Sequence, residues 1–156
     1  MDKELFFKRL LESLEQALAG ALEASHDAAD YAVNEESRAE SKWDTQGLEA
    51  SYLAAGQADQ ARQCAEVISG LKAQQSELLK EKKCICPGAL FLCQINGSDE
   101  YFFYAAVAGG HTVRMGRSEI TVISPQSPLA GRLLGLKKGD DFRMPNGHPG
   151  KLIHVC

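Results

Sequence analysis

The sequence predicts an α+β protein in which an N-terminal long antiparallel α-helical coiled-coil hairpin (residues 1–83) precedes a domain with a mostly antiparallel sheet and one short helix (residues 84–156). Apolar and small residues recur at helical spacing in the first half, which contains no proline before Pro87. After residue 83 the pattern changes to short apolar runs separated by turn residues. We therefore expect two domains, with a boundary between residues 83 and 84.

Two narrow stripes predict the helices of the hairpin. From Leu5 to about Ser37 the apolar and small residues lie 3 or 4 positions apart, at Leu11, Leu14, Leu18, Leu22 (with Ala21 beside it), Ser25, Ala28 and Ala32. The second stripe runs through Ala54, Gln57, Ala61, Cys64, Ile68, Leu71, Gln75 and Leu78. Stripes of this width are typical of a coiled-coil seam, and two such helices joined by a short loop must run antiparallel.

The second half predicts short strands and one helix. Residues 89–95 and 100–108 flank Asn96-Gly97, a dipeptide that favours a type I′ hairpin. Further strands are expected at 111–116, 119–124 and 151–155, with a turn leading into a strand at 136–142. Residues 127–135 predict a short helix with Ser127 as N-cap, Pro128 at the first helical position and Gly135 as the stop.

The charge distribution differs between the halves. Residues 1–83 carry a net charge of −6 and residues 84–156 a net charge of +2. Binding of free nucleic acid needs a clustered basic face, so this balance argues against it. The sequence has no apolar run of the length that spans a membrane, and its start lacks the features of a signal peptide, so we expect a cytoplasmic protein.

Five cysteines, an odd number without a disulfide framework, indicate reduced thiols. Cys84 and Cys86 form a CxC pair, whereas structural zinc sites typically use CxxC. The alternatives are a zinc site and a pair of small buried side chains at the start of a strand.

Two parts of the sequence carry a family resemblance: ITVISPQSPLAGRLLGLKKGDDF (residues 120–142) with the PNG turn at 145–147, and EASYLAAGQAD (residues 49–59). The first is similar to the C-terminal signature of the GreA/GreB family of bacterial transcription elongation factors. The second is similar to the segment that opens the second helix of that family. The resemblance implies a coiled coil followed by an FKBP-like domain. It also implies binding to RNA polymerase, with the domain at the rim of the secondary channel and the coiled coil reaching the active centre, close to nascent RNA and DNA.

In the family, acidic residues at the tip of the coiled coil help to hold a second Mg²⁺ and a water, so that the polymerase cleaves backtracked RNA. The family's two tip acids lie three residues apart. If Asp44 is matched to the first of these acids, Gly47 falls at the position of the second. If the alignment is anchored on Tyr52 instead, Thr45 and Leu48 fall at the two acidic positions. Glu40, Asp44 and Glu49 would then be the substitute acids near this Mg²⁺. No stably bound cofactor is implied.

Two further features have both a functional and a purely structural interpretation. Trp43 either stacks on a base or the polymerase wall, or folds back over the end of the hairpin. Gln126, Ser127 and Pro128 occupy the place where the family's domain contacts the channel rim; the alternative is a helix cap alone.

The leading functional hypothesis is a monomeric, secondary-channel regulator that is not an enzyme on its own but stimulates the RNA cleavage activity of RNA polymerase. The second is a cleavage-inactive relative that competes with other channel factors. The third, peptidyl-prolyl isomerase activity, needs an aromatic-lined pocket, whereas Phe91, Tyr101, Phe102, Phe103, Tyr104 and Phe142 are mostly explained as strand core.

Overall fold

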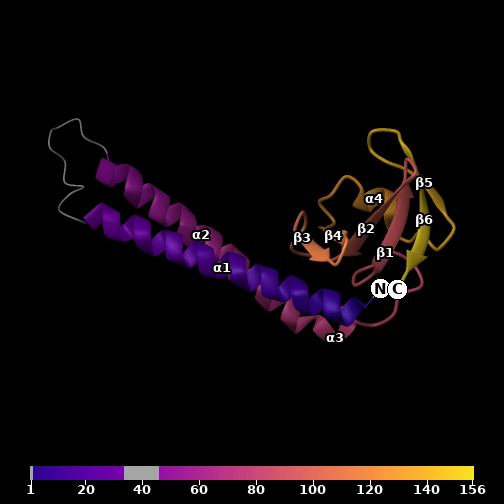
Figure 1. Ribbon diagram of the computed structural model, residues 1–156, viewed down its shortest axis with the longest axis horizontal. Coiled ribbons are helices and arrows are strands. Elements are labelled where there is room, and N and C mark those ends of the chain that lie inside the picture. Colours follow the sequence, from indigo (N-terminus) through magenta and orange to yellow (C-terminus); the bar gives the residue numbers. More distant parts are fainter. Residues whose placement is uncertain (1, 34–45) are drawn as a thin grey trace. The chain divides into compact units, whose positions relative to one another are not determined.

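The computed structural model describes residues 2–33 and 46–156 (Figure 1). The helices are α1 (Lys3–Val33), α2 (Gln46–Ala73), α3 (Gln75–Leu78) and α4 (Ala130–Leu133). The strands are β1 (Leu90–Ile95), β2 (Ser98–Tyr104), β3 (Thr112–Met115), β4 (Ser118–Ile123), β5 (Asp141–Arg143) and β6 (Pro149–Val155). The predicted α+β class is confirmed. Within the described ranges, no helix has both the length and the apolar character needed to cross a bilayer.

The chain divides into two compact units. One comprises Glu12–Ser69, and the other joins Met1–Leu11 to Gly70–Cys156. The second unit therefore contains the sheet together with the first turns of α1 and the end of α2. The expected boundary between residues 83 and 84, which separates the hairpin from the sheet domain, stays a prediction.

In the unit of Glu12–Ser69, α1 and α2 run antiparallel and side by side (Figure 1). Ser25 Oγ donates to Ala54 O at 3.1 Å, and Cys64 Sγ donates to Leu14 O at 3.3 Å. The buried side chains form a seam of mostly small residues: Leu14, Ala21, Ala28, Ala50, Ala61 and Ile68. The predicted antiparallel hairpin is thus confirmed over the described part of the chain.

One residue that the sequence placed in the apolar stripe of α1 does not face the partner helix. Leu22 is 55% exposed, and the neighbouring Ala21 is buried instead. Leu14, Ala21 and Ala28 follow each other at intervals of seven, the period that keeps a seam facing its partner helix. Leu22 lies one position off this repeat, so its side chain turns towards solvent.

The other unit contains a six-stranded sheet in the order β3-β4-β2-β1-β6-β5. All neighbouring pairs are antiparallel except β2 and β4, which are parallel, so the expected mostly antiparallel sheet is confirmed. Asn96 and Gly97 have φ angles of 50° and 84° and form the two-residue loop between β1 and β2. This is the type I′ geometry expected from the dipeptide. β2 ends at Tyr104, short of the predicted Ala108, whose φ of 63° does not fit a strand.

The two faces of the sheet are covered by different helices. α4 packs on one face, where the buried cluster includes Ile85, Phe91, Cys93, Ile95, Phe102, Tyr104, Leu129, Ala130, Leu133, Phe142 and Leu152. On the other face, the ring of Phe103 contacts Phe6 and Phe7 of α1, with centroids 5.0 and 6.5 Å apart. Burial on both faces stabilises the sheet through the apolar area removed from water.

Candidate functional site

The turn that precedes α4 carries the predicted docking residues Gln126, Ser127 and Pro128. Ser127 N donates to Ser124 O at 2.9 Å, and Ala130 N donates to Ser127 O at 3.0 Å. Ser127 Oγ accepts a hydrogen bond from Leu129 N at 3.3 Å. Gln126 and Pro128 are exposed on this turn, whereas Ser127 is half-buried. The backbone hydrogen bonds therefore fix the turn while two of its side chains face solvent.

The predicted helix over residues 127–135 is too long. α4 spans Ala130–Leu133, its N-cap is Leu129, and no side chain caps it. The hydrogen bond from Ala130 N to Ser127 O closes a turn of the i to i+3 type, so the segment up to Leu129 is a tight turn. Ser127 supports this turn through its Oγ and does not act as the N-cap. Gly135 ends the segment with a φ of 84°, as expected of a C-terminal glycine.

The predicted metal-binding acids belong to the segment that joins α1 to α2 and to the start of α2. Glu49 is exposed in the first turn of α2. Glu40, Asp44 and Trp43 lie outside the described residues, so their placement stays a prediction. No group of three His, Cys, Asp or Glu side chains with metal-binding geometry occurs within residues 2–33 and 46–156.

The part of the hairpin nearest to these acids exposes large apolar side chains. Of the seven large hydrophobic residues that are exposed in the described part of the chain, five lie here: Leu22, Val33, Leu48, Tyr52 and Leu53. Tyr52 is 70% exposed and Val33 is 83% exposed. Exposed apolar side chains of this size are candidate contacts with another macromolecule. Sequence reasoning missed their exposure, although each of them lies off the seam positions or beside them.

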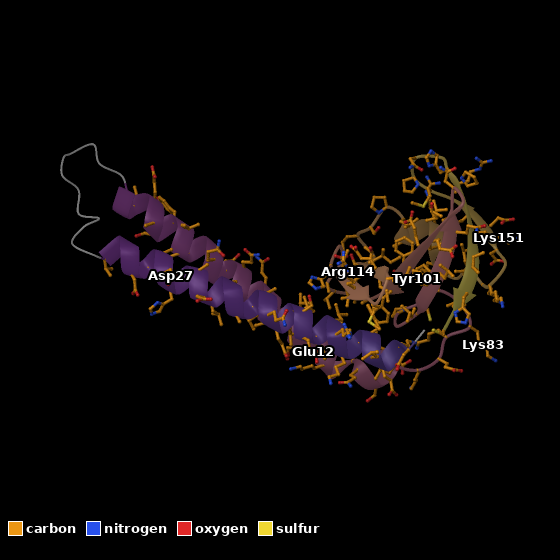
Figure 2. All side chains as sticks on the ribbon, in the orientation of Figure 1. Glu12, Asp27, Lys83, Tyr101, Arg114 and Lys151 are labelled. Carbon is orange, nitrogen blue, oxygen red and sulfur yellow. The ribbon has the colours of Figure 1, made fainter. Side chains whose placement is uncertain are left out.

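The same segments carry only negative formal charge. Residues 12–33 and 46–61 contain seven Asp and Glu residues and no Lys or Arg. Figure 2 shows two of these acids, Glu12 and Asp27, on α1. A surface with acidic groups and exposed apolar side chains suits a basic protein partner better than a phosphate backbone.

A shallow hollow lies on the sheet between β1, β2 and the C-terminus. It has a volume of about 410 Å³ and is lined by Leu90, Phe91, Leu92, Tyr101, His154 and Cys156. Of the aromatic residues named for an isomerase pocket, Phe91, Phe102, Phe103, Tyr104 and Phe142 are buried. Their burial agrees with the interpretation as strand core. Tyr101, labelled in Figure 2, is half-buried at the hollow.

The fold and the site together define the class of protein. It combines an antiparallel helical hairpin, which carries acidic residues and exposed apolar side chains, with a sheet unit that has an ordered turn before α4.

No family model matches the sequence, and no curated protein matches it significantly. Among solved structures, the chain is similar to GreA factor homolog 1 (Gfh1) of Thermus thermophilus, at 19% identity over 94% of each chain and a TM-score of 0.38.

Gfh1 of Thermus aquaticus is similar at 17% identity over 97% of this chain and 94% of that one, with a TM-score of 0.35. Another structure of the transcription factor Gfh1 gives 19% identity, coverage of 96% and 92%, and a TM-score of 0.38. At these TM-scores we base the function on the residues of this chain alone.

Proposed function

We propose that the chain is a regulator of transcription elongation that binds RNA polymerase at its secondary channel and extends the hairpin end towards the active centre. The observation that carries the proposal is the set of exposed apolar side chains, Leu22, Val33, Leu48, Tyr52 and Leu53, on two helical segments, residues 12–33 and 46–61, that contain no Lys or Arg. Moving apolar groups at these positions from water into a protein-lined passage would stabilise the complex. Acidic groups would guide the hairpin to a basic surface.

The turn at Gln126–Pro128 supports a second contact. Gln126 and Pro128 are exposed, and the turn is fixed by hydrogen bonds to Ser124, Leu129 and Ala130. A pre-organised turn loses little conformational entropy when it binds. In the proposed complex this turn contacts the rim of the channel.

The carboxylates near the hairpin end define the chemical role. Glu49 is exposed in the first turn of α2, where an acidic side chain is favourable. Glu40, Asp44 and Glu49 would supply oxygen ligands to a weakly held second Mg²⁺ of the polymerase, the arrangement that supports cleavage of a phosphodiester. In this proposal the chain adds ligands, and the polymerase performs the cleavage.

A second candidate is a channel-binding regulator without cleavage activity. The sequence favours it because neither alignment of the tip preserves an acidic pair three residues apart. This regulator would occupy the channel and displace other factors that use it.

Binding is tested by gel filtration of the full chain with core RNA polymerase at micromolar concentration. Both candidates predict co-elution, and its absence contradicts both. Replacing Gln126 and Pro128 by alanine should weaken the complex. Pro145→Ala, at an exposed proline in a different turn, is the matched control and should bind as the unchanged chain does.

Cleavage of RNA in a backtracked complex separates the two candidates. The leading proposal predicts cleavage that is lost in Asp44→Ala and reduced in Glu49→Ala. Glu23→Ala removes an exposed acid elsewhere on the hairpin and should cleave normally. Binding without cleavage by the unchanged chain supports the second candidate and rules out the first.

A further inference from the structure

The segment that follows the turn at Gln126–Pro128 is basic. Residues 129–151 contain five Lys and Arg residues and two Asp residues, and all seven are exposed. Both carboxylates already have a partner. Asp140 Oδ2 accepts a hydrogen bond from Lys137 N at 2.8 Å, and Asp141 Oδ1 lies 4.0 Å from Lys151 Nζ. The positive charge of the two arginines in this segment is therefore not balanced by its acids.

These arginines, Arg132 and Arg143, come together from different elements. Arg132 Nη1 on α4 donates to Arg143 O at the end of β5 at 3.4 Å, and Arg143 Nη1 donates to Gly147 O at 3.4 Å. In the described part of the chain, both guanidinium groups thus bond to backbone carbonyls and not to a carboxylate. A guanidinium has five N–H donors and binds carboxylates through paired hydrogen bonds, so most donors of both groups are left for an acidic partner.

A hollow beside Arg143 adds apolar surface to this site. It has a volume of about 310 Å³ and is lined by Asp141, Phe142, Arg143, Pro149 and Gly150. A Cβ at Gly150 would lie 2.4 Å from Cζ of Phe142, so glycine lets this ring lie directly against the strand. Surfaces that bind single-stranded nucleic acid present exposed aromatic rings to the bases, whereas Phe142 is buried. Two guanidinium groups beside an apolar hollow suit a protein segment that carries acidic and apolar side chains.

We propose that Arg132 and Arg143 extend the docking turn at Gln126–Pro128 and bind an acidic segment of RNA polymerase. This inference rests on the proposed function, in which the turn contacts the rim of the channel. The two parts are continuous, because Arg132 N donates to Leu129 O, directly after the turn, at 3.0 Å. The hairpin segments carry the opposite charge, so the two contacts select different surfaces of the polymerase.

Charge reversal tests the inference with the full chain and core polymerase. The double variant Arg132→Glu and Arg143→Glu should bind about tenfold or more weakly in competition with a labelled unchanged chain. Replacing both by glutamine removes the charges without adding acids and should weaken binding less. Arg114→Glu is the matched control, because Arg114 is exposed on β3 at the opposite edge of the sheet from β5 (Figure 2). This control should bind as the unchanged chain does, and circular dichroism checks that all variants stay folded.

A second measurement identifies the chemistry of the ligand. A short fluorescein-labelled peptide in which glutamates flank one leucine is titrated with the full chain and followed by fluorescence anisotropy. The unchanged chain should bind this peptide about tenfold or more tightly than the same peptide with serine in place of each glutamate. The double charge reversal should abolish this preference. Tighter binding of a labelled single-stranded DNA through the same two arginines would overturn the proposal in favour of a nucleic-acid ligand.

The outcomes separate this inference from the proposed function. If the unchanged chain does not bind core polymerase, the proposed function fails and the inference fails with it. If the unchanged chain binds and the double charge reversal binds equally well, the proposed function stands and the inference is overturned. An equal loss of affinity in Arg114→Glu would also overturn it, because net charge and not the position of the two arginines would then govern binding.

Discussion

The ring of Phe6 in α1 packs on the ring of Phe103 in β2, with centroids 5.0 Å apart and planes inclined by 54°. Both side chains are fully buried, and Phe7 adds a second aromatic contact to Phe103. Aromatic pairs in this geometry contribute beyond the area they bury. This contact explains why residues 1–11 belong to the same compact unit as the sheet.

Replacing Phe6 by alanine should strongly destabilise this unit. The change removes a fully buried ring and leaves a cavity beside Phe103, which typically costs about 3–5 kcal/mol of the free energy of unfolding. Urea unfolding followed by circular dichroism measures the loss. Leu5→Ala, at a neighbouring residue that is 42% exposed, is the control and should change stability much less. Equal effects of the two changes would contradict the packing described.

Gly88 and Gly97 both have positive φ angles, 88° and 84°, but differ in the space around them. A Cβ at Gly97 meets nothing within 4 Å, whereas one at Gly88 would lie 2.6 Å from Leu78 O. Alanine at Gly97 should cost about 1–2 kcal/mol for the backbone conformation alone. Alanine at Gly88 should cost clearly more, because the backbone of Leu78 must also move. Thermal or urea unfolding of both variants checks the order, and a smaller loss at Gly88 would refute it.

Glu77 should contribute stability that depends on pH. Hydrogen bonds from Lys80 and Lys82, at 2.5 and 2.9 Å, lower the pKa of Glu77 from 4.5 to about 2. Because the folded pKa is the lower one, the contribution is present above the unfolded pKa and is lost as the pH falls through about 2.

The measurement compares the unchanged chain with Glu77→Gln across this range. The difference in unfolding free energy should be constant above about pH 5 and should shrink as the pH falls. It is expected to be small because the Glu77 side chain is exposed to solvent. Glu119→Gln serves as the control at an exposed strand position. A difference that grows towards low pH would contradict the assignment.

Local signals allowed much of the fold to be predicted. Asn96 and Gly97 are residue types that readily adopt the positive φ angles of their turn. Gly135 ends the α4 segment because glycine also adopts a positive φ angle easily. The pairing of β2 with β4 and of β1 with β6 could not be predicted in this way. Phe91 pairs with Val155, far away in the sequence, and such pairs depend on the packing of the whole sheet.

The candidate site was predictable only where the chemistry is local. Gln126 and Pro128 do lie on an exposed turn. The sequence wrongly suggested that Ser127 caps a helix starting at Pro128, whereas α4 begins at Ala130. The exposure of Leu22 was missed because one position decides between the seam and solvent in a heptad repeat. The facing helix determines which of two neighbouring side chains is buried, and the apolar pattern of one helix alone does not specify this.

The exposed side chains of Leu48 and Tyr52 allow a direct test of the hairpin's proposed insertion into the polymerase channel. Replacing both by serine removes apolar surface from residues that are 55% and 70% exposed and leaves the buried seam intact. The free energy of unfolding should therefore change by only about 0.5 kcal/mol per site. Affinity for core polymerase should fall about tenfold or more, equivalent to about 1.4 kcal/mol, because the serine side chains have less apolar surface to remove from water on binding. Competition binding with a labelled unchanged chain measures the loss, and Leu5→Ser is the control with an exposed leucine at the start of α1. If the double variant binds normally while the Gln126 and Pro128 variant does not, the chain docks through the turn alone and the hairpin does not enter a protein-lined passage.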